Sequence, residues 1–235
     1  TQCADEFLDR AGDVLDAEFG KSHLFVIKDP RICRLMPFWN LVFKNQAIEP
    51  IYIHTHRNPI DAANSLQSRE EWPLAYGMLL WLRHVLDAEQ GSRGAKRVFT
   101  SYDRLLNNWN SVVTNIQTRT DLIFPRQSEA VAIEIDDFLE ADLSNSTSTV
   151  DNIKANPLIS EWVRQVFEIL ERWADSGEKK ADFAALDAIR AEFDGTTPMF
   201  GKLVQTARNG LKYKKELEAS VEKASALEGS VKDYK

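Results

Sequence analysis

The stretch from Pro50 to Arg69 reads PIYIHTHRNPIDAANSLQSR and predicts a strand that turns directly into a helix. The apolar run at 51–53 favours the strand, because β-branched and aromatic residues pack well on a pleated surface. Asn58 is a preferred N-cap residue, and Pro59 suits the first helical position, where no backbone N–H is needed. We therefore expect a helix to begin directly after Arg57.

This junction is suited to binding an anion. At 3.6 residues per turn, Ser65 and Arg69 lie on one face of the expected helix, whose first turn starts beside Arg57. Two guanidinium groups, a hydroxyl and the unpaired amides of a helix N-terminus can together surround a phosphate. Ligands of open α/β sheets bind outside the carboxyl ends of the strands, which is where Arg57 stands. The alternative is that Arg57 pairs with Asp61 and that Ser65 is only a small helix residue.

The same residues carry a family resemblance. Arg57, followed eight positions later by Ser65, resembles the 3′-phosphate-binding segment of sulfotransferases that use 3′-phosphoadenosine 5′-phosphosulfate. Arg69 is similar to an additional arginine in the protein-tyrosine branch of that superfamily. The resemblance spans residues 20–125 and is closest to bacterial sulfotransferases of the heparan and tyrosylprotein type.

Two further segments agree with this resemblance. The stretch FVIKDPR at 25–31 resembles the strand segment whose lysine, here Lys28, faces the transferred sulfuryl group. The stretch RVFTSYDRLLNNW at 97–109 resembles the strand-to-helix segment whose tyrosine, here Tyr102, lies at the nucleotide. From the residues alone, Lys28 could equally pair with Asp29 at the surface, and Tyr102 could simply close the edge of the core.

The resemblance implies an α/β fold of the P-loop NTPase-like sulfotransferase type, with a parallel sheet flanked by helices. It implies an enzyme that uses 3′-phosphoadenosine 5′-phosphosulfate as co-substrate, without a metal, and a hydroxyl or amine acceptor, expected to be a carbohydrate. Lys28 would be catalytic, because a cation stabilises the negative charge that grows on the bridging oxygen. The nucleotide would be held by Arg57, Ser65, Arg69 and Tyr102.

The chain departs from the family pattern in two respects. The histidine that follows the lysine two places later in the cytosolic branch is Pro30 here, so no general base is assigned. In the tyrosylprotein branch a glutamate on an upstream helix serves, and Glu6, Asp9 or Asp13 is the candidate for that place here, with none preferred. The sequence also contains neither the Ser/Gly/Thr-rich phosphosulfate loop nor a G-x-x-x-x-G-K-[ST] motif, and we expect an N-terminally truncated domain that lacks its first strand and this loop.

Two other functions remain open. One is a catalytically inactive nucleotide-binding or scaffolding module of the same fold. The other, more distant, is a fragment of a P-loop kinase, which has no use for a 3′ phosphate. Arg31 and Arg34 are candidates for contacting an anionic substrate, or else pair with the acids of the first helix.

The amino-acid composition excludes several classes of protein. The chain has 235 residues, 43% of them hydrophobic, which is enough for one main core. A formal net charge of -7 argues against general nucleic-acid binding. Two cysteines give no disulfide framework and favour a cytoplasmic location. His54 and His56 share a strand face without a third ligand, so no metal site is expected. The sequence has no apolar run of ~18 residues, so no membrane span is expected either.

The order of the expected elements favours a parallel sheet with helical crossovers. We expect strands at 23–28, 51–53 and 97–101, and helices at 4–18, 35–45, 72–89, 103–118, 159–173 and 180–193. Residues 126–157 are predicted to be irregular, with the Ser/Thr run at 144–149 acting as a spacer or a lid. The expected organisation is an α/β core at 1–125, its loop and helical completion at 126–199, and a polar helical tail at 200–235. That tail would serve self-association, join a fused domain, or remain solvated.

Overall fold

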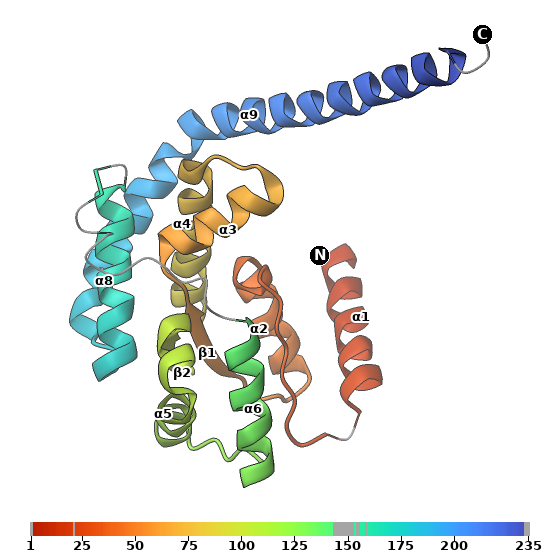
Figure 1. Cartoon of the computed structure of the whole chain (residues 1–235). Helices are drawn as coiled ribbons and strands as arrows, with labels where there is room; N and C mark the ends of the chain where they lie inside the picture. The colour runs from red at the N-terminus through yellow and green to blue at the C-terminus, as the bar shows by residue number, and fades with distance from the viewer. Residues whose placement is uncertain (1, 21, 143–152, 154–155, 158, 233–235) are drawn as a thin grey trace. The chain divides into compact units, whose positions relative to one another are not determined.

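The computed structural model describes residues 2–20, 22–142, 153, 156–157 and 159–232. By contacts the chain divides into two compact units, Thr1–Leu186 and Asp187–Lys235. The described residues are mostly helical, with one small sheet (Figure 1). The elements of the first part are α1 (Gln2–Phe19), η1 (Ile32–Leu35), α2 (Met36–Asn45), β1 (Ile51–His56), α3 (Pro59–Glu70), α4 (Leu74–Gly91) and β2 (Lys96–Ser101). They are followed by α5 (Tyr102–Thr120), α6 (Glu129–Asp142), α8 (Glu161–Ser176), η2 (Lys180–Asp182) and α9 (Phe183–Lys232).

The sheet consists of β1 and β2, which pair in parallel. Ile51 lies opposite Lys96 at one end, and His56 lies opposite Ser101 at the other. Both strands therefore end at the same level, and a helix follows each: α3 after β1 and α5 after β2. The strands expected at 51–53 and 97–101 and their parallel pairing are confirmed.

Helices pack on both faces of this sheet. Val98 of β2 packs against Val112 and Ile116 of α5. The next side chain along the strand, Phe99, points the other way, and its ring meets Trp173 of α8 with 4.8 Å between the centroids. This arrangement of helices around a parallel sheet is compatible with the expected α/β class.

The strand expected at 23–28 is wrong. This segment is not part of a sheet, although its side chains alternate as those of a strand would. Phe25 and Ile27 pack against the apolar cluster between α1 and α2, whereas Val26 is 76% exposed. Alternation decides only which side chains face the core, and a strand also needs a neighbour to bond its backbone. Among the described residues the only strands are β1 and β2, and they pair with each other.

The irregular structure expected at 126–157 is also wrong in part, because α6 occupies Glu129–Asp142. Ser128 caps this helix by accepting a hydrogen bond at its Oγ from the backbone N–H of Val131, at 3.3 Å. The half-buried Val131, Ile135 and Leu139 recur at every fourth position, which is the spacing of a helix face. The Ser/Thr run at 144–149 lies outside the described residues.

The remaining helices agree with the sequence. Those expected at 4–18, 35–45, 72–89, 103–118 and 159–173 are confirmed as α1, α2, α4, α5 and α8. The helices expected at 180–193 and beyond 200 form one continuous element, α9, with Pro198 inside it.

Candidate functional site

The carboxyl ends of the two strands bring Arg57 and Tyr102 together. Because His56 lies opposite Ser101, the next residue of each chain segment stands at the same edge of the sheet. The guanidinium carbon of Arg57 lies 5.0 Å from the centroid of the Tyr102 ring. A cation over an aromatic face at this distance is attracted by the electrons of the ring. Two of the residues expected to hold a nucleotide are therefore neighbours.

The backbone of Arg57 is held in place by a hydrogen bond from α4. Its backbone carbonyl accepts a hydrogen bond from the Trp81 indole Nε1 of α4 at 2.9 Å. Its side-chain Nε is buried without a hydrogen-bond partner in the described structure. In the same part of the chain no carboxylate forms an ion pair with Arg57, so the alternative pairing with Asp61 is not observed. A guanidinium nitrogen of this kind requires an explanation, because buried polar groups are normally satisfied.

The N-terminus of α3 begins one residue after Arg57. Asn58, only 1% exposed, caps the helix: its Oδ1 accepts a hydrogen bond from the backbone N–H of Ile60 at 2.9 Å. Pro59 occupies the first turn, as the sequence predicts. The cap and the helix dipole place partial positive charge beside the Arg57 guanidinium.

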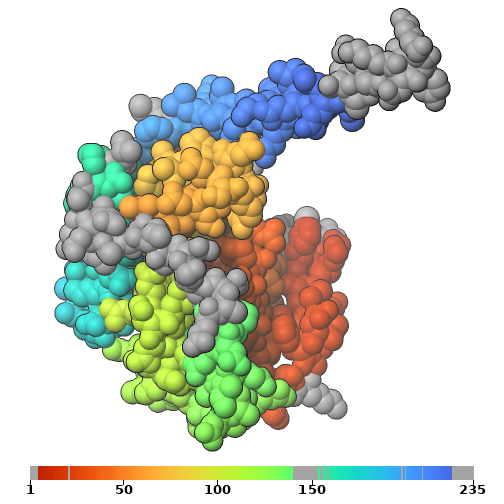
Figure 2. Space-filling view, in the orientation of Figure 1, coloured from red at the N-terminus to blue at the C-terminus, as the bar shows by residue number. Residues whose placement is uncertain are grey.

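Ser65 and Arg69 lie further along α3, and both side chains are exposed. In the space-filling view α3 lies at the surface of the molecule (Figure 2). The Arg69 Nε lies 3.3 Å from Glu70 Oε1, an ion pair between exposed groups that contributes little. Both side chains are thus open to a ligand, and neither is covered by packing.

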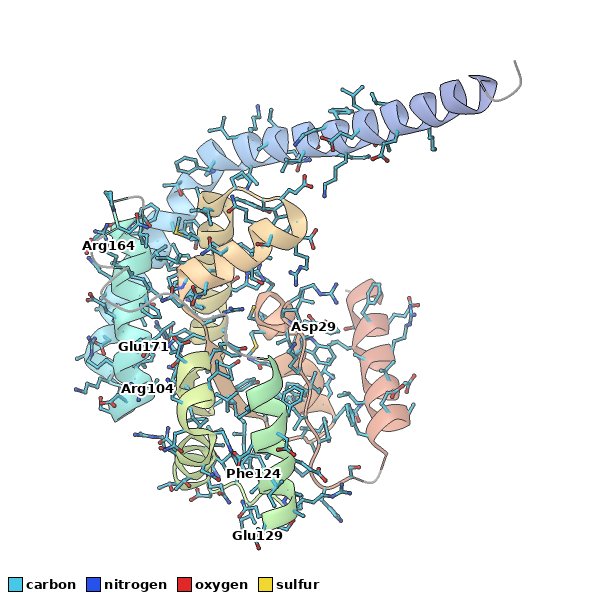
Figure 3. The ribbon with its side chains drawn as sticks, in the orientation of Figure 1. Asp29, Arg104, Phe124, Glu129, Arg164 and Glu171 are labelled. Carbon is cyan, nitrogen blue, oxygen red and sulfur yellow. The ribbon has the colours of Figure 1, made fainter. Side chains whose placement is uncertain are left out.

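Lys28 lies outside the sheet, on the segment between α1 and η1, and its side chain is exposed. It does not take Asp29 as its partner. Arg31 donates to both oxygens of Asp29, at 3.1 Å and 2.8 Å, and this pairing lowers the pKa of the carboxyl to about 2. Figure 3 shows Asp29 well separated from Arg104, which lies in the first turn of α5.

Arg31 and Arg34 do not pair with the acids of the first helix. Arg31 binds Asp29, and Arg34 binds Asp87 of α4. Both arginines are therefore engaged within the fold, at its surface.

Sequence reasoning missed a polar cluster on the α8 side of the strand ends. The His56 ring, whose side chain is 2% exposed, shares a hydrogen bond of 2.6 Å between its Nε2 and Glu171 Oε1 of α8. Arg104 of α5 lies beside the same carboxylate, with its Nε 3.8 Å from Glu171 Oε2 (Figure 3). The second ring nitrogen, His56 Nδ1, is buried without a partner in the described structure.

The charge of Glu171 is stabilised by these neighbours. Burial opposes its ionisation. The hydrogen bond and charge of His56, the charge of Arg104 and a hydrogen bond from Ser101 outweigh burial, and they hold its pKa below the usual value. A carboxylate from α8 therefore ties both strand ends to that helix.

A second buried cluster ties α4 to the other end of β2. Arg97 and Glu89, each with a side chain 3% exposed, form an ion pair of 3.1 Å. Arg97 also donates to Ser92 Oγ at 3.0 Å, and that hydroxyl is shared with His54 Nε2 at 2.8 Å. Removing one partner of such a pair leaves a buried charge uncompensated, which is strongly destabilising.

The ring of His54 in this cluster is difficult to protonate. Its ring stacks on Phe99 with 4.4 Å between the centroids. Burial, together with the charges of Arg97 and His56, lowers its pKa to about 3. The imidazole therefore remains neutral at physiological pH.

Neither a metal centre nor a membrane span is indicated where the chain is described. His54 and His56 use Nε2 for Ser92 and Glu171, and the described residues contain no group of three or more side chains suited to holding a metal ion. Within that same part of the chain, no helix combines the length and apolar character needed to cross a bilayer.

Comparisons of the chain with protein-family models, with curated proteins and with solved structures give no match.

The lowered pKa of the half-buried His54 predicts a specific pH dependence of stability. The unfolded chain binds a proton on this ring below its ordinary value of 6.5, whereas the folded chain does so only near 3. The free energy of unfolding therefore falls as the pH falls through this window, by about 1 kcal/mol per pH unit from this group. In His54→Gln this component is absent, so the variant loses less stability than the wild type between pH 6.5 and pH 4.

Urea unfolding at several pH values measures the difference, with the exposed His23→Gln as matched control. Identical pH slopes for the wild type and His54→Gln would contradict the assignment.

Proposed function

We propose that this chain is a sulfotransferase domain that uses 3′-phosphoadenosine 5′-phosphosulfate, with the 3′ phosphate of the nucleotide bound at the carboxyl ends of β1 and β2. The observation that carries the proposal is the buried, unpartnered Nε of Arg57 beside the N-terminus of α3. That nitrogen is a hydrogen-bond donor at the carboxyl ends of the strands, where open parallel sheets bind their ligands.

The chemistry of this position favours a phosphate. The face of the Arg57 guanidinium meets Tyr102, and its planar edge is the part that binds two oxygens of one anion. The amides of the first turn of α3 add donors, and no described carboxylate competes for Arg57. Ser65 and Arg69, exposed on the same helix, supply a hydroxyl and a second cation for a group that carries two negative charges.

In the transfer step, the bond between sulfur and the bridging oxygen of the donor breaks as the acceptor oxygen or nitrogen bonds to sulfur. Negative charge grows on the bridging oxygen, and the acceptor gives up its proton. The exposed Lys28 has no ion pair among the described residues, so its ammonium is available to stabilise that charge. The acceptor we propose is a hydroxyl or amine of a carbohydrate.

A second candidate is a module of the same kind that binds the nucleotide without transferring sulfate. The observation that favours it is the place of Lys28, on an exposed segment that is not part of the sheet whose strand ends hold Arg57 and Tyr102. Binding and transfer therefore need separate experiments.

Calorimetry with adenosine 3′,5′-bisphosphate tests the binding proposal. Arg57→Ala removes a charged hydrogen bond to phosphate and is expected to weaken binding by ~1.5–3 kcal/mol, whereas the exposed Arg126→Ala leaves it unchanged. The wild type should bind the bisphosphate more tightly than ATP, because Arg57 reads the 3′ phosphate. Equal affinity for both nucleotides favours a kinase-like site, and an unchanged affinity of Arg57→Ala refutes the proposed role.

Transfer of labelled sulfate to a polysaccharide separates the two candidates. If Lys28 stabilises the transition state, Lys28→Ala lowers the turnover number by about 10²–10³-fold with little change in bisphosphate affinity. Lys179→Ala, another exposed lysine, serves as control. The assay uses this chain and any longer protein that contains it. Tight nucleotide binding with no transfer in either would establish the module that only binds.

A further inference from the structure

Residues 200–215 of α9, which we call the basic segment, form an amphipathic stretch of helix. Its apolar side consists of residues that recur every three or four positions, namely Phe200, Leu203, Val204, Ala207 and Leu211. Phe200 is 42% exposed and Leu203 is 64% exposed, whereas Val204 and Leu211 are half-buried. None of these five side chains is fully covered in the single chain.

The opposite side of the basic segment is polar. Its members repeat at the same spacing and are exposed: Lys202, Gln205, Asn209 and Lys212. Lys214 and Lys215 follow the apolar side by one helical turn, and they border it on its two flanks. Lysines in such positions lay their aliphatic stems along apolar surface and keep their ammonium groups among polar partners.

The basic segment has a charge opposite to that of the chain as a whole. It contains five basic residues and no acidic one, whereas the full chain has 36 acidic and 29 basic residues and a formal net charge of -7. Acidic residues resume directly after it, at Glu216, Glu218 and Glu222. An anionic partner is therefore attracted to the basic segment and repelled by the residues that follow it.

A bilayer that contains anionic lipids suits both sides of this segment. Its headgroups carry negative charge, and the acyl chains below them accept apolar side chains. A helix that lies in the plane of the surface presents its apolar side to the acyl chains and its polar side to water. A soluble polyanion would attract the lysines but would leave the exposed Leu203 in water.

We propose that the basic segment of α9 binds the surface of membranes that contain anionic lipids. Its axis lies in the plane of the surface, with Phe200 and Leu203 at the boundary between headgroups and acyl chains. Lys214 and Lys215, on the flanks of the apolar side, reach the anionic headgroups. The helix lies on the membrane and does not cross it.

Co-sedimentation of the full chain with lipid vesicles tests the role of charge. The wild type is expected to bind phosphatidylcholine vesicles that contain phosphatidylserine, and not vesicles of phosphatidylcholine alone. Lys214→Gln together with Lys215→Gln is expected to raise the dissociation constant about 30-fold, because two charges next to the surface are lost. Lys179→Gln together with Lys223→Gln is the matched control, because it changes the net charge equally at exposed positions outside the segment.

The same assay tests the role of the apolar side. Phe200→Ser together with Leu203→Ser is expected to raise the dissociation constant at least about tenfold, because two apolar side chains no longer leave water. Leu217→Ser together with Val221→Ser is the matched control. These side chains are 65% and 60% exposed on the acidic part of the helix, and their loss should leave binding unchanged. Circular dichroism confirms that each variant remains folded.

A fluorescent label tests the orientation of the helix in a background with Cys3→Ser and Cys33→Ser. Ala207→Cys lies on the apolar side and Gln205→Cys on the polar side, and each carries a nitrobenzoxadiazole group. Anionic vesicles should shift the emission of the label at position 207 to shorter wavelength and leave that at position 205 in place. Equal shifts at both positions overturn the proposed orientation.

Other results overturn the proposal as a whole. They are equally tight binding to phosphatidylcholine alone, and wild-type affinity in either double variant of the basic segment. A chain that binds heparin or RNA but no vesicle shows attraction by charge alone and also overturns it, as does a chain that binds none of these. No nucleotide is present in these assays, so their outcome is independent of the proposed transferase function.

Discussion

The parallel pairing of β1 with β2, in the register that sets His56 opposite Ser101, is the constraint on which the rest of the structure depends. It ends both strands at one level, so that the residues after them, Arg57 and Tyr102, become neighbours although 45 positions separate them in the sequence. A slip of one residue would turn every side chain of one strand to the opposite face. Such a slip in β1 would turn His56 away from Glu171, and such a slip in β2 would turn Val98 away from α5.

Two buried polar clusters hold this register from either end. At the start of β2, Arg97 binds Glu89 of α4, and at the end of β1, His56 binds Glu171 of α8. Both clusters pair a strand residue with a carboxylate from a helix. Arg57 differs from these groups because its buried Nε has no such partner in the described structure. The buried Nε of Arg57, which no described carboxylate approaches, is consistent with a ligand anion at that point.

Local signals made the β1–α3 junction predictable. The apolar run at 51–53, the Asn58 cap and Pro59 specify a strand, a helix start and their boundary without distant contacts. The position of Arg57 follows from these signals. The segment at 23–28 shows the limit of this reasoning, because its alternating side chains were correct and yet no strand lies beside it. At α6 the error was different: polarity concealed the helical spacing of Val131, Ile135 and Leu139.

Long-range contacts explain what the sequence could not reveal. Glu171 lies 115 positions from its partner His56, and nothing in the amphipathic pattern of α8 marks this glutamate among the others on the helix. A local pairing was also not evident from the sequence, because Asp29 lies next to Lys28 but binds Arg31, two positions away. Spacing along a chain identifies which residues can meet, whereas packing decides which of them do.

The role of Arg57 in binding the 3′ phosphate is tested most directly by the ¹H–¹⁵N NMR signal of its Nε–H group, assigned by the loss of that signal in Arg57→Lys. We expect this signal to shift when adenosine 3′,5′-bisphosphate is added and to stay in place with adenosine 5′-monophosphate, because the buried Nε donates to the 3′ phosphate. An Arg57 signal that remains unchanged while other resonances report binding of the bisphosphate would contradict it.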